Sequence, residues 1–229
     1  MRYNPNQFEA DTKRLFSRWA GRYDSWIFRL YFERLYHRIL KVLGSQGTNY
    51  FSSQAKVLDI ACGTGEIIFR LAQTYPNVKF IGIDLTPEMV ELARVKTKQL
   101  PNIEIQQGNA TKLSFPPNEF IVVICSEAFH HFLQPKEVLR EIYRITSVGG
   151  LFLLVDPGSR SVLITRVIAM IAKTFEVNKQ IYSQQQLQLL LKQAGFALRL
   201  SFEYFFNNFF VAIKLSSVPI RLNRTYADN

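Results

Sequence analysis

The sequence predicts an α/β fold: a doubly wound, seven-stranded, mostly parallel sheet with an antiparallel hairpin at its C-terminal end and N-terminal helices as a cap. Three observations predict it. Short apolar runs alternate with helical patterns along the middle of the chain. The run at residues 120–125 is apolar on both faces, as buried parallel strands are. The first run ends in a glycine turn that leads directly into a helix.

The first 50 residues carry a helical pattern. Apolar and aromatic side chains recur three or four positions apart over residues 8–49, and Gly44 and Gly47 end the second of two such runs. Basic side chains lie along the same segment: Arg29, Arg34, Arg38 and Lys41. Such a surface can line a pocket or contact a membrane peripherally, although a helix packed on the sheet edge is commoner. We expect residues 1–50 to form a helical cap.

The middle of the chain alternates between strand and helix signals. The expected strands are residues 56–61, 78–84, 103–107, 120–125 and 151–155. The expected helices are residues 65–74, 87–98 and 135–146. This alternation predicts a parallel sheet with helices on both faces and right-handed crossovers.

After residue 156 the pattern becomes less regular. Residues 162–175 and 184–194 have helical patterns, and the second begins at a good N-cap, Ser183, and ends before Gly195. Residues 197–204 and 209–215 are expected strands, with Asn207 and Asn208 as a two-residue turn. We therefore expect one α/β domain over residues 51–215, with a lid insertion at about 157–182, and a polar tail over residues 216–229.

The charge is unevenly distributed over the 229 residues. Residues 1–50 and 151–229 each hold nine Lys and Arg against four Asp and Glu, whereas residues 51–150 hold ten of each, so the flanks carry the whole net charge of +10. This excess is typical of a chain that attracts anionic partners, and equally of one with a solvated, solubilising surface.

Other sequence features bear on class and compartment. No run of about 18 uncharged apolar residues predicts a transmembrane helix, and residues 1–10 lack the apolar region of a signal peptide. Cys62 and Cys125 have neither disulfide nor metal-ligand spacing, so we expect free thiols, no metal and a cytoplasmic protein.

The glycine turn and two acidic residues predict a nucleotide-like ligand. Gly63 and Gly65 allow the backbone to turn tightly and approach a ligand, and Asp59 lies near the C-terminal end of the first strand. Asp84 ends the second strand 19 positions after Gly65, close to the offset at which an acidic residue binds ribose hydroxyls. Asp84 could instead cap the following helix, but Thr86 is the better candidate for that role.

The sequence lacks the motifs of three other classes of protein: nicotinamide dehydrogenases, P-loop proteins and hydrolases with a nucleophile elbow. A nicotinamide dehydrogenase has a third Gly or Ala where this chain has Ile68, which makes an oxidoreductase the weaker prediction. The Gly-Lys-Ser/Thr sequence of a P-loop and the Gly-x-Ser-x-Gly sequence of a nucleophile elbow do not occur.

Five segments in order resemble the class I S-adenosylmethionine-dependent methyltransferases, particularly the branch that acts on small molecules in ubiquinone and menaquinone biosynthesis. They are VLDIACGTG at residues 57–65, IGIDLTPEM at 81–89, GNATKLSF at 108–115, FIVVICSEAFHHF at 120–132 and GGLFLLVDP at 149–157. The resemblance extends over most of residues 15–215. It implies a Rossmann-like fold and S-adenosylmethionine as cofactor, and it says little about the methyl acceptor.

The resemblance also implies roles for individual residues. Asp59, Gly63 and Gly65 would hold the methionine end of the cofactor, and Ser126 would lie near its amino group. Asp84 would bind the ribose hydroxyls. The adenine would meet four residues: Leu85, Met89, Asn109 and Ala110. Tyr23 would close over the cofactor from the N-terminal helices. The family usually has Asp where this chain has Asn109, whose carbonyl can still accept a hydrogen bond from adenine.

The acceptor side offers His130 and His131 as candidate catalytic bases, because histidine is the natural base near neutral pH. Adjacent side chains usually diverge, so we expect only one to face the substrate, and a structural role for both is nearly as well supported. Cys125, on a strand, is expected to be a buried, inert thiol. Residues 8–45, 157–182 and 204–210 should cover the substrate.

The aromatic, apolar and basic composition of these segments predicts a small aromatic or lipid-like acceptor, with an acidic group as one option, methylated on oxygen, carbon or nitrogen. A nucleic-acid methyltransferase would use the positive charge, but the residues after the fourth strand are Cys125–Ser126–Glu127–Ala128 rather than an Asn/Asp-Pro-Pro-aromatic sequence. A non-catalytic regulator that keeps the cofactor fold is the remaining alternative, and intact Asp59 and Asp84 disfavour it.

Overall fold

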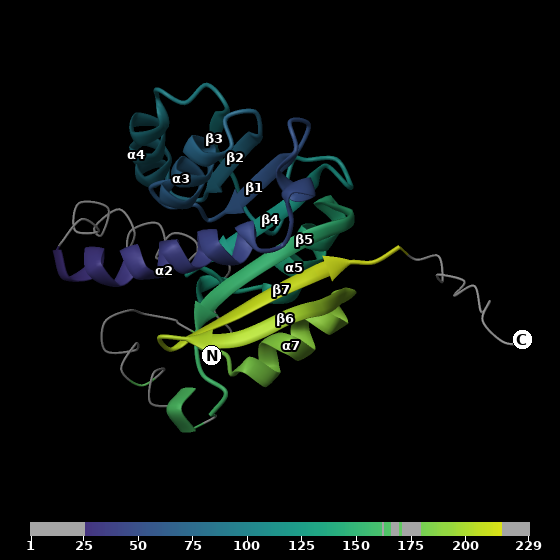
Figure 1. Cartoon of the computed structure of the whole chain (residues 1–229). Helices are drawn as coiled ribbons and strands as arrows, with labels where there is room; N and C mark the ends of the chain where they lie inside the picture. Colours follow the sequence, from purple (N-terminus) through teal and green to yellow (C-terminus); the bar gives the residue numbers. More distant parts are fainter. Residues whose placement is uncertain (1–25, 162, 166–169, 171–179, 217–229) are drawn as a thin grey trace, which may run out of the picture.

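The computed structural model describes residues 26–161, 163–165, 170 and 180–216. Seven strands form one sheet in the order β3-β2-β1-β4-β5-β7-β6 (Figure 1). The first five pair in parallel, and β7 lies antiparallel between β5 and β6. The predicted mostly parallel sheet with an antiparallel C-terminal hairpin is confirmed. The strands are β1 Lys56–Ile60, β2 Lys79–Asp84, β3 Ile103–Gln107, β4 Phe120–Ser126, β5 Thr146–Pro157, β6 Phe196–Tyr204 and β7 Asn207–Lys214.

Helices cover both faces of the sheet because the strands are apolar on both sides. In β4, Val122 and Ile124 face the core layer that contains α2, α3 and α4, whereas Val123 and Cys125 face the layer that contains α5 and α7. The sheet is therefore buried between two apolar layers. The helices are α2 Trp26–Gly44, η1 Thr48–Phe51, α3 Glu66–Thr74, α4 Pro87–Thr97, η2 Phe129–His131, α5 Pro135–Ile145 and α7 Gln184–Gln193.

The order of the strands determines where a ligand can bind. β1 has β2 on one side and β4 on the other, so the chain reverses its direction of travel across the sheet between them. Ligands of open α/β sheets bind at the carboxyl ends of the strands at such a point. Asp59 and Asp84 lie at the ends of β1 and β2 that face it.

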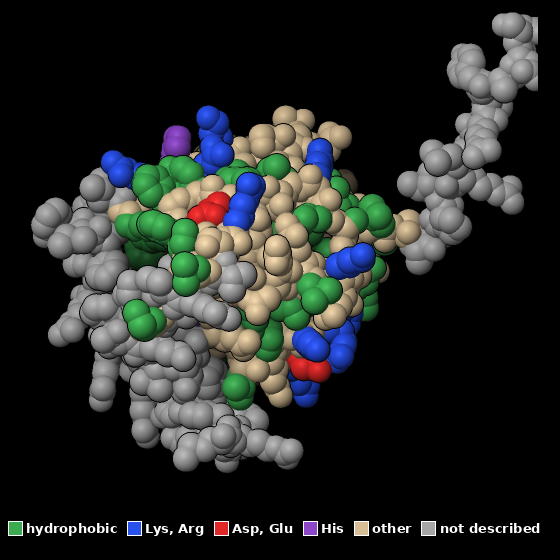
Figure 2. Space-filling model, turned by 90° about the horizontal axis from the view of Figure 1, so that it is seen from below, with side chains coloured by type: hydrophobic (Ala, Val, Ile, Leu, Met, Phe, Trp, Pro, Cys, Tyr) green, Lys and Arg blue, Asp and Glu red, His purple; other side chains and the backbone are tan. Residues whose placement is uncertain are grey.

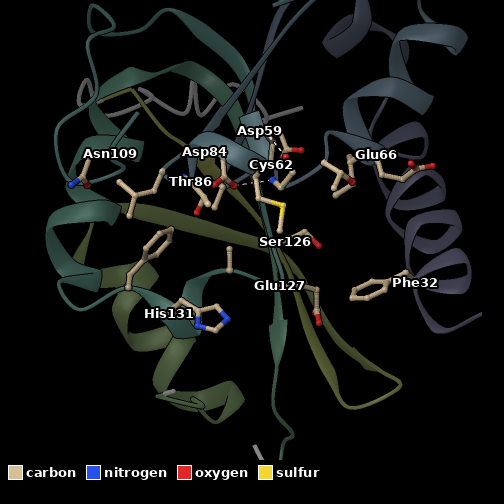
Figure 3. Close-up of a pocket in the computed structure, with 18 of the residues that line it drawn as sticks. Phe32, Asp59, Cys62, Glu66, Asp84, Thr86, Asn109, Ser126, Glu127 and His131 are labelled. Carbon is tan, nitrogen blue, oxygen red and sulfur yellow. Dashed lines mark hydrogen bonds between the residues drawn. The ribbon is translucent and has the colours of Figure 1, made fainter. Parts of the chain in front are cut away.

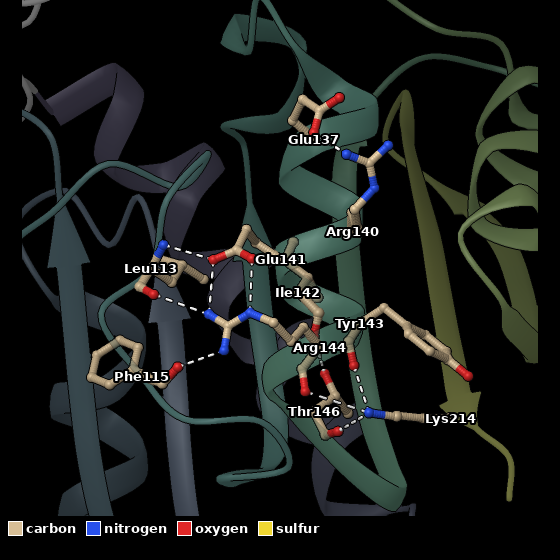
Figure 4. A network of polar contacts seen from close by, with 10 residues as sticks. All are labelled: Leu113, Phe115, Glu137, Arg140, Glu141, Ile142, Tyr143, Arg144, Thr146 and Lys214. Atoms are coloured by element: carbon tan, nitrogen blue, oxygen red, sulfur yellow. Dashed lines mark hydrogen bonds and ion pairs between the residues drawn. The ribbon is translucent and has the colours of Figure 1, made fainter.

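Two cations bind backbone carbonyls around the C-terminal end of α5 (Figure 4). Lys214, at the end of β7, is 8% exposed, and its Nζ donates to the carbonyls of Tyr143 and Thr146 at 2.8 and 2.9 Å. It therefore satisfies carbonyls at the C-terminal end of α5, where a positive charge is favourable. Arg144 donates to the carbonyls of Leu113 and Phe115, which ties the loop after β3 to the same helix.

The expected turn at Asn207 and Asn208 is wrong. β6 and β7 are joined by Phe205 and Phe206, with φ of 46° and 61°, and Tyr204 pairs with Asn207. Positive φ at both central residues is the pattern of a type I′ turn, which Asn and Gly normally favour. Asn207 and Asn208 begin β7 and are fully buried, because β7 extends two residues further to pair with the end of β5.

Two end signals of α7 are confirmed. The Ser183 side chain accepts the backbone N–H of Gln186, the Gln186 side chain accepts that of Ser183, and Gly195 follows with φ 99°. Most of the expected helix at residues 162–175 lies outside the described residues. Tyr23 also lies outside them. Thr146 was expected to end a helix but instead begins β5, where it pairs with Phe120.

Candidate cofactor and active site

A cavity lies at the carboxyl ends of β1, β2 and β4, and α2 covers one side of it (Figure 3). Four carboxylates line it, at Asp59, Glu66, Asp84 and Glu127. Among the described lining residues there is no Lys or Arg. Although the chain carries a charge of +10, this cavity is therefore acidic.

The glycine loop between β1 and α3 forms the floor of the cavity. Gly63 and Gly65 have φ of 54° and 75°, which non-glycine residues adopt only with strain. A Cβ added at Gly63 would meet nothing within 4 Å, so the backbone there faces open space. The Gly63 N–H donates to Asp84 Oδ2 at 2.9 Å, which fixes the loop against the end of β2.

Asp84 holds two backbone groups at once. Its Oδ1 accepts the N–H of Thr86 at 2.9 Å, while Oδ2 accepts that of Gly63. Burial raises the pKa of Asp84, although these backbone hydrogen bonds oppose the rise. Thr86 occupies the N-cap position of α4, but its side chain makes no capping bond, so Asp84 performs part of the role expected of Thr86.

Asp59 and Ser126 present polar atoms that no other group satisfies. Asp59 is 2% exposed, and its Oδ2 has no hydrogen-bond partner among the described residues; the buried Ser126 Oγ has none there either. Burial and then the charge of Asp84 raise the pKa of Asp59 well above its ordinary value. Both residues line the cavity. An unpaired buried carboxylate is costly, and a cationic ligand would remove that cost.

Glu66 differs from Asp59 because it is already paired. Its Oε1 accepts from Arg70 and its Oε2 from Lys96, each at 2.7 Å. Burial acts against ionisation, but these hydrogen bonds lower the pKa of Glu66 overall. Arg70 also pairs with Glu33 of α2 and lies 5.5 Å from the Tyr36 ring, so this network connects α2 to α3.

Of the four residues expected around adenine, three line the cavity and one does not. Leu85, Met89 and Asn109 line the cavity, whereas the side chain of Ala110 packs in the core layer beneath α5. Asn109 Oδ1 accepts from the backbone N–H and the hydroxyl of Thr111, at 2.9 and 2.8 Å. In this conformation Asn109 shapes its own loop, and its contact with adenine stays a prediction.

The opposite side of the cavity contains aromatic side chains and the carboxylate of Glu127, whose backbone is strained. Phe32 and Tyr36 reach it from α2, and His131 reaches it from η2 (Figure 3). Glu127 follows β4 with φ 54°, a strained conformation for a residue with a side chain. Burial and then the charge of Glu127 raise the pKa of Tyr31.

The two adjacent histidines occupy different environments. His131 lines the cavity, whereas His130 is 3% exposed and does not. His130 Nδ1 lies 2.8 Å from Oδ1 of Asp156, which is fully buried at the end of β5. The two rings are in contact, with centroids 4.0 Å apart. The Asp156 pairing therefore fixes the ring against which His131 packs.

Several lining residues were not predicted. Phe32 and Tyr36 lie one helical turn apart on α2, but the sequence does not reveal how that helix docks. Glu127 lies next to a predicted residue, Ser126, and only its backbone conformation turns it toward the cavity. Gly65 shapes the loop without lining the cavity. Tyr204–Phe210 were expected over the substrate, but among the described residues they do not line the cavity, because β7 lies beyond β5 in the sheet.

Three further features concern cysteines, metals and membranes. Burial raises the pKa of the Cys125 thiol, which suits the inert role expected of it. Within the described ranges, no group of three or more His, Cys, Asp or Glu side chains could hold a metal ion. No helix in the described part of the chain is long and apolar enough to cross a membrane.

Comparisons with known proteins agree with this arrangement. A family model described as "Methyltransferase domain" matches residues 51–195. Demethylmenaquinone methyltransferase of Deinococcus radiodurans is 36% identical over 106 residues, which are 45% of this chain and 44% of that protein. The uncharacterized methyltransferase YcgJ of Bacillus subtilis is 38% identical over 107 residues, 45% of this chain and 41% of that protein. The matched part is therefore less than half the length of either relative.

Solved structures give the same result for the fold. The YcgJ crystal structure has a TM-score of 0.59 and 28% identity, and the match covers 66% of this chain and 68% of that chain. The PH0226 protein of Pyrococcus horikoshii has a TM-score of 0.67 and 23% identity, covering 83% of this chain and 92% of that chain.

Proposed function

Because the chain belongs to the methyltransferase-domain family, we propose that it transfers a methyl group from S-adenosylmethionine to a small aromatic or lipid-like acceptor. The methyl group would go to oxygen, carbon or nitrogen of that acceptor. The matched relatives named for demethylmenaquinone support this class of acceptor.

The acidic cavity is the observation that carries the proposal. S-adenosylmethionine has a sulfonium and an ammonium group, whereas a dinucleotide has a negatively charged pyrophosphate. Arg70 and Lys96 pair with Glu66, but no Lys or Arg lines the cavity beside its other three carboxylates among the described residues, and this favours the cation. The unpaired atoms of Asp59 and Ser126 provide an acceptor for the ammonium group.

The other cofactor contacts follow from the same geometry. Asp84, at the end of β2, would accept hydrogen bonds from the ribose hydroxyls. Leu85 and Met89 offer apolar surface for adenine beside it. When bound, S-adenosylmethionine supplies an activated methyl group, so the remaining task of the chain is alignment.

On the acceptor side, Phe32 and Tyr36 would pack against an aromatic ring and exclude water. His131 and Glu127 line the cavity, and we propose that His131 takes a proton from the acceptor while Glu127 accepts a hydrogen bond from it. His130 would act through His131, as a positioning residue held by Asp156.

A panel of acceptors tests the proposal directly. The full chain is incubated with methyl-labelled S-adenosylmethionine and with quinols, phenols, small acids, cationic amines or RNA, and transfer to each is counted. We expect label on the aromatic or lipid-like members, and a loss of turnover on all of them in Asp84→Asn. Turnover restricted to polar cationic amines or to RNA would overturn the acceptor class, and failure to bind the cofactor would favour a non-catalytic role.

A further inference from the structure

The tip of the β6–β7 hairpin combines exposed aromatic rings with cations from neighbouring segments. We propose that this tip docks onto an anionic lipid bilayer, with Phe205 and Phe206 entering the apolar part of the membrane. The inference goes beyond the proposed methyl transfer and does not require it.

In this hairpin the turn carries apolar residues and the adjoining buried strand carries polar ones, which is the reverse of the usual arrangement. Phe205 and Phe206 form the turn and are 52% and 62% exposed, whereas Asn207 and Asn208 are fully buried in β7. Turn positions with positive φ favour Asn and Gly, and burial favours Phe. The chain therefore accepts backbone strain and exposed apolar area at the same two positions. Local conflicts of this kind are expected at functional sites.

The tip does not project alone. The segment after β5 is fastened to it, because the Gly158 N–H donates to the Phe206 carbonyl at 2.7 Å and the Arg160 N–H donates to the Glu203 side chain at 3.0 Å. Leu163 and Ile164 follow in this segment and are 71% and 42% exposed. Two segments distant in sequence, joined at Gly158 and Phe206, thus carry exposed apolar side chains beyond the ends of β5 and β6.

The charges around the tip are complementary to an anionic surface. The guanidinium of Arg34, on α2, lies 5.9 Å from the Phe205 ring, and Arg38 lies 4.9 Å from the ring of Phe202. The neighbouring acid, Glu203, already accepts from Ser159 and Arg160. Cations beside inserted aromatic rings are the usual composition of a surface that binds anionic lipid. Figure 2 shows Lys and Arg side chains interspersed with hydrophobic ones on the face seen from below.

The shape of the tip favours a bilayer over other partners. A two-residue turn is convex and narrow, so it can enter a fluid apolar layer but presents little area to a rigid protein partner. Nucleic acid would be bound by stacking on a ring or by phosphate contacts, neither of which requires exposed aliphatic side chains such as Leu163 and Ile164.

The experiment is vesicle co-sedimentation of the full chain, without cofactor or acceptor, on phosphatidylcholine vesicles with and without phosphatidylglycerol. The test variant is Phe205→Asn with Phe206→Gly, which installs the preferred residues of a type I′ turn and should fold at least as well as the natural chain. We expect binding to the anionic vesicles, and a loss of roughly tenfold or more in the variant. Arg34→Gln should reduce the preference for anionic lipid by about fivefold.

A double variant, Val95→Asn with Leu189→Asn, is the matched control, since it removes exposed apolar side chains on α4 and α7 instead. It should bind vesicles like the natural chain. Equal vesicle binding by the turn variant would overturn the proposal. So would the absence of binding of the natural chain to anionic vesicles, whether or not the chain binds RNA or self-associates instead. Because no methyl transfer is measured, failure of the proposed function would leave this result intact.

Discussion

Asp59 should strengthen cofactor binding, and it should lower the free energy of unfolding of the chain when no ligand is bound. Its carboxylate is 2% exposed, its Oδ2 has no partner, and Asp84 lies close enough to raise its pKa further. Asp59→Asn removes the charge and keeps the shape. We therefore expect the variant to be more stable than the natural chain and to bind S-adenosylmethionine less tightly.

The magnitudes follow from one buried, unpaired charge. Relieving it should add about 1–2 kcal/mol to the free energy of unfolding at neutral pH. For a domain of this size that raises Tm by roughly 2–8 °C. Losing a charged hydrogen-bond partner should cost about 1.5–3 kcal/mol of binding, or roughly a tenfold to hundredfold weaker affinity.

The pH dependence has a definite sign. Because the folded-state pKa of Asp59 is raised, its ionisation destabilises the fold as pH rises above its unfolded value of about 4. The stability gained in Asp59→Asn should therefore vanish near pH 4 and grow toward neutral pH. Calorimetric unfolding over this range, with titration calorimetry for S-adenosylmethionine, measures both effects.

Glu66→Gln is the matched control. Glu66 lines the same cavity, but its cationic partners lower its pKa, so its removal should reduce stability above pH 4. If Asp59→Asn were less stable than the natural chain at neutral pH, or bound the cofactor equally well, the reasoning about the unpaired carboxylate would be refuted.

Three further predictions follow from other parts of the structure. S-adenosylmethionine binding should release protons and become tighter as pH rises, because the cation lowers the raised pKa of Asp59. Titration calorimetry in buffers of different ionisation enthalpy measures the number of protons released. Proton uptake on binding would contradict this prediction. Lys214→Met should lower the free energy of unfolding in urea by about 2–4 kcal/mol, since buried carbonyls of α5 lose their donor, whereas the exposed Lys192→Met should change it by less than about 0.5 kcal/mol. His131→Gln should lower kcat about a hundredfold or more and leave cofactor affinity within about twofold. The control is His37→Gln, which changes an exposed histidine on α2. An unchanged kcat in His131→Gln would exclude His131 as the base.

The sheet and the cofactor loop could be predicted because their signals are local. Alternating strands and helices determine the sheet, and the positions of Gly63, Asp59 and Asp84 follow from where strands end. Ser126 could be placed for the same reason.

The missed features depend on contacts between distant segments. Asn207 and Asn208 favour a turn locally, but pairing with β5 draws them into β7 and moves the turn to Phe205 and Phe206. Phe32 reaches the cavity through the docking of α2, and the adjacency of His130 and His131 does not reveal which ring Asp156 holds.

The central claim is that the end of β2 and the glycine loop bind S-adenosylmethionine through Asp84. Titration calorimetry of the cofactor with the natural chain, Asp84→Ala and the exposed α4 variant Glu91→Ala tests it most directly. We expect Asp84→Ala to weaken binding about a hundredfold and Glu91→Ala to leave it unchanged. Equal affinity in the natural chain and a folded Asp84→Ala would contradict it.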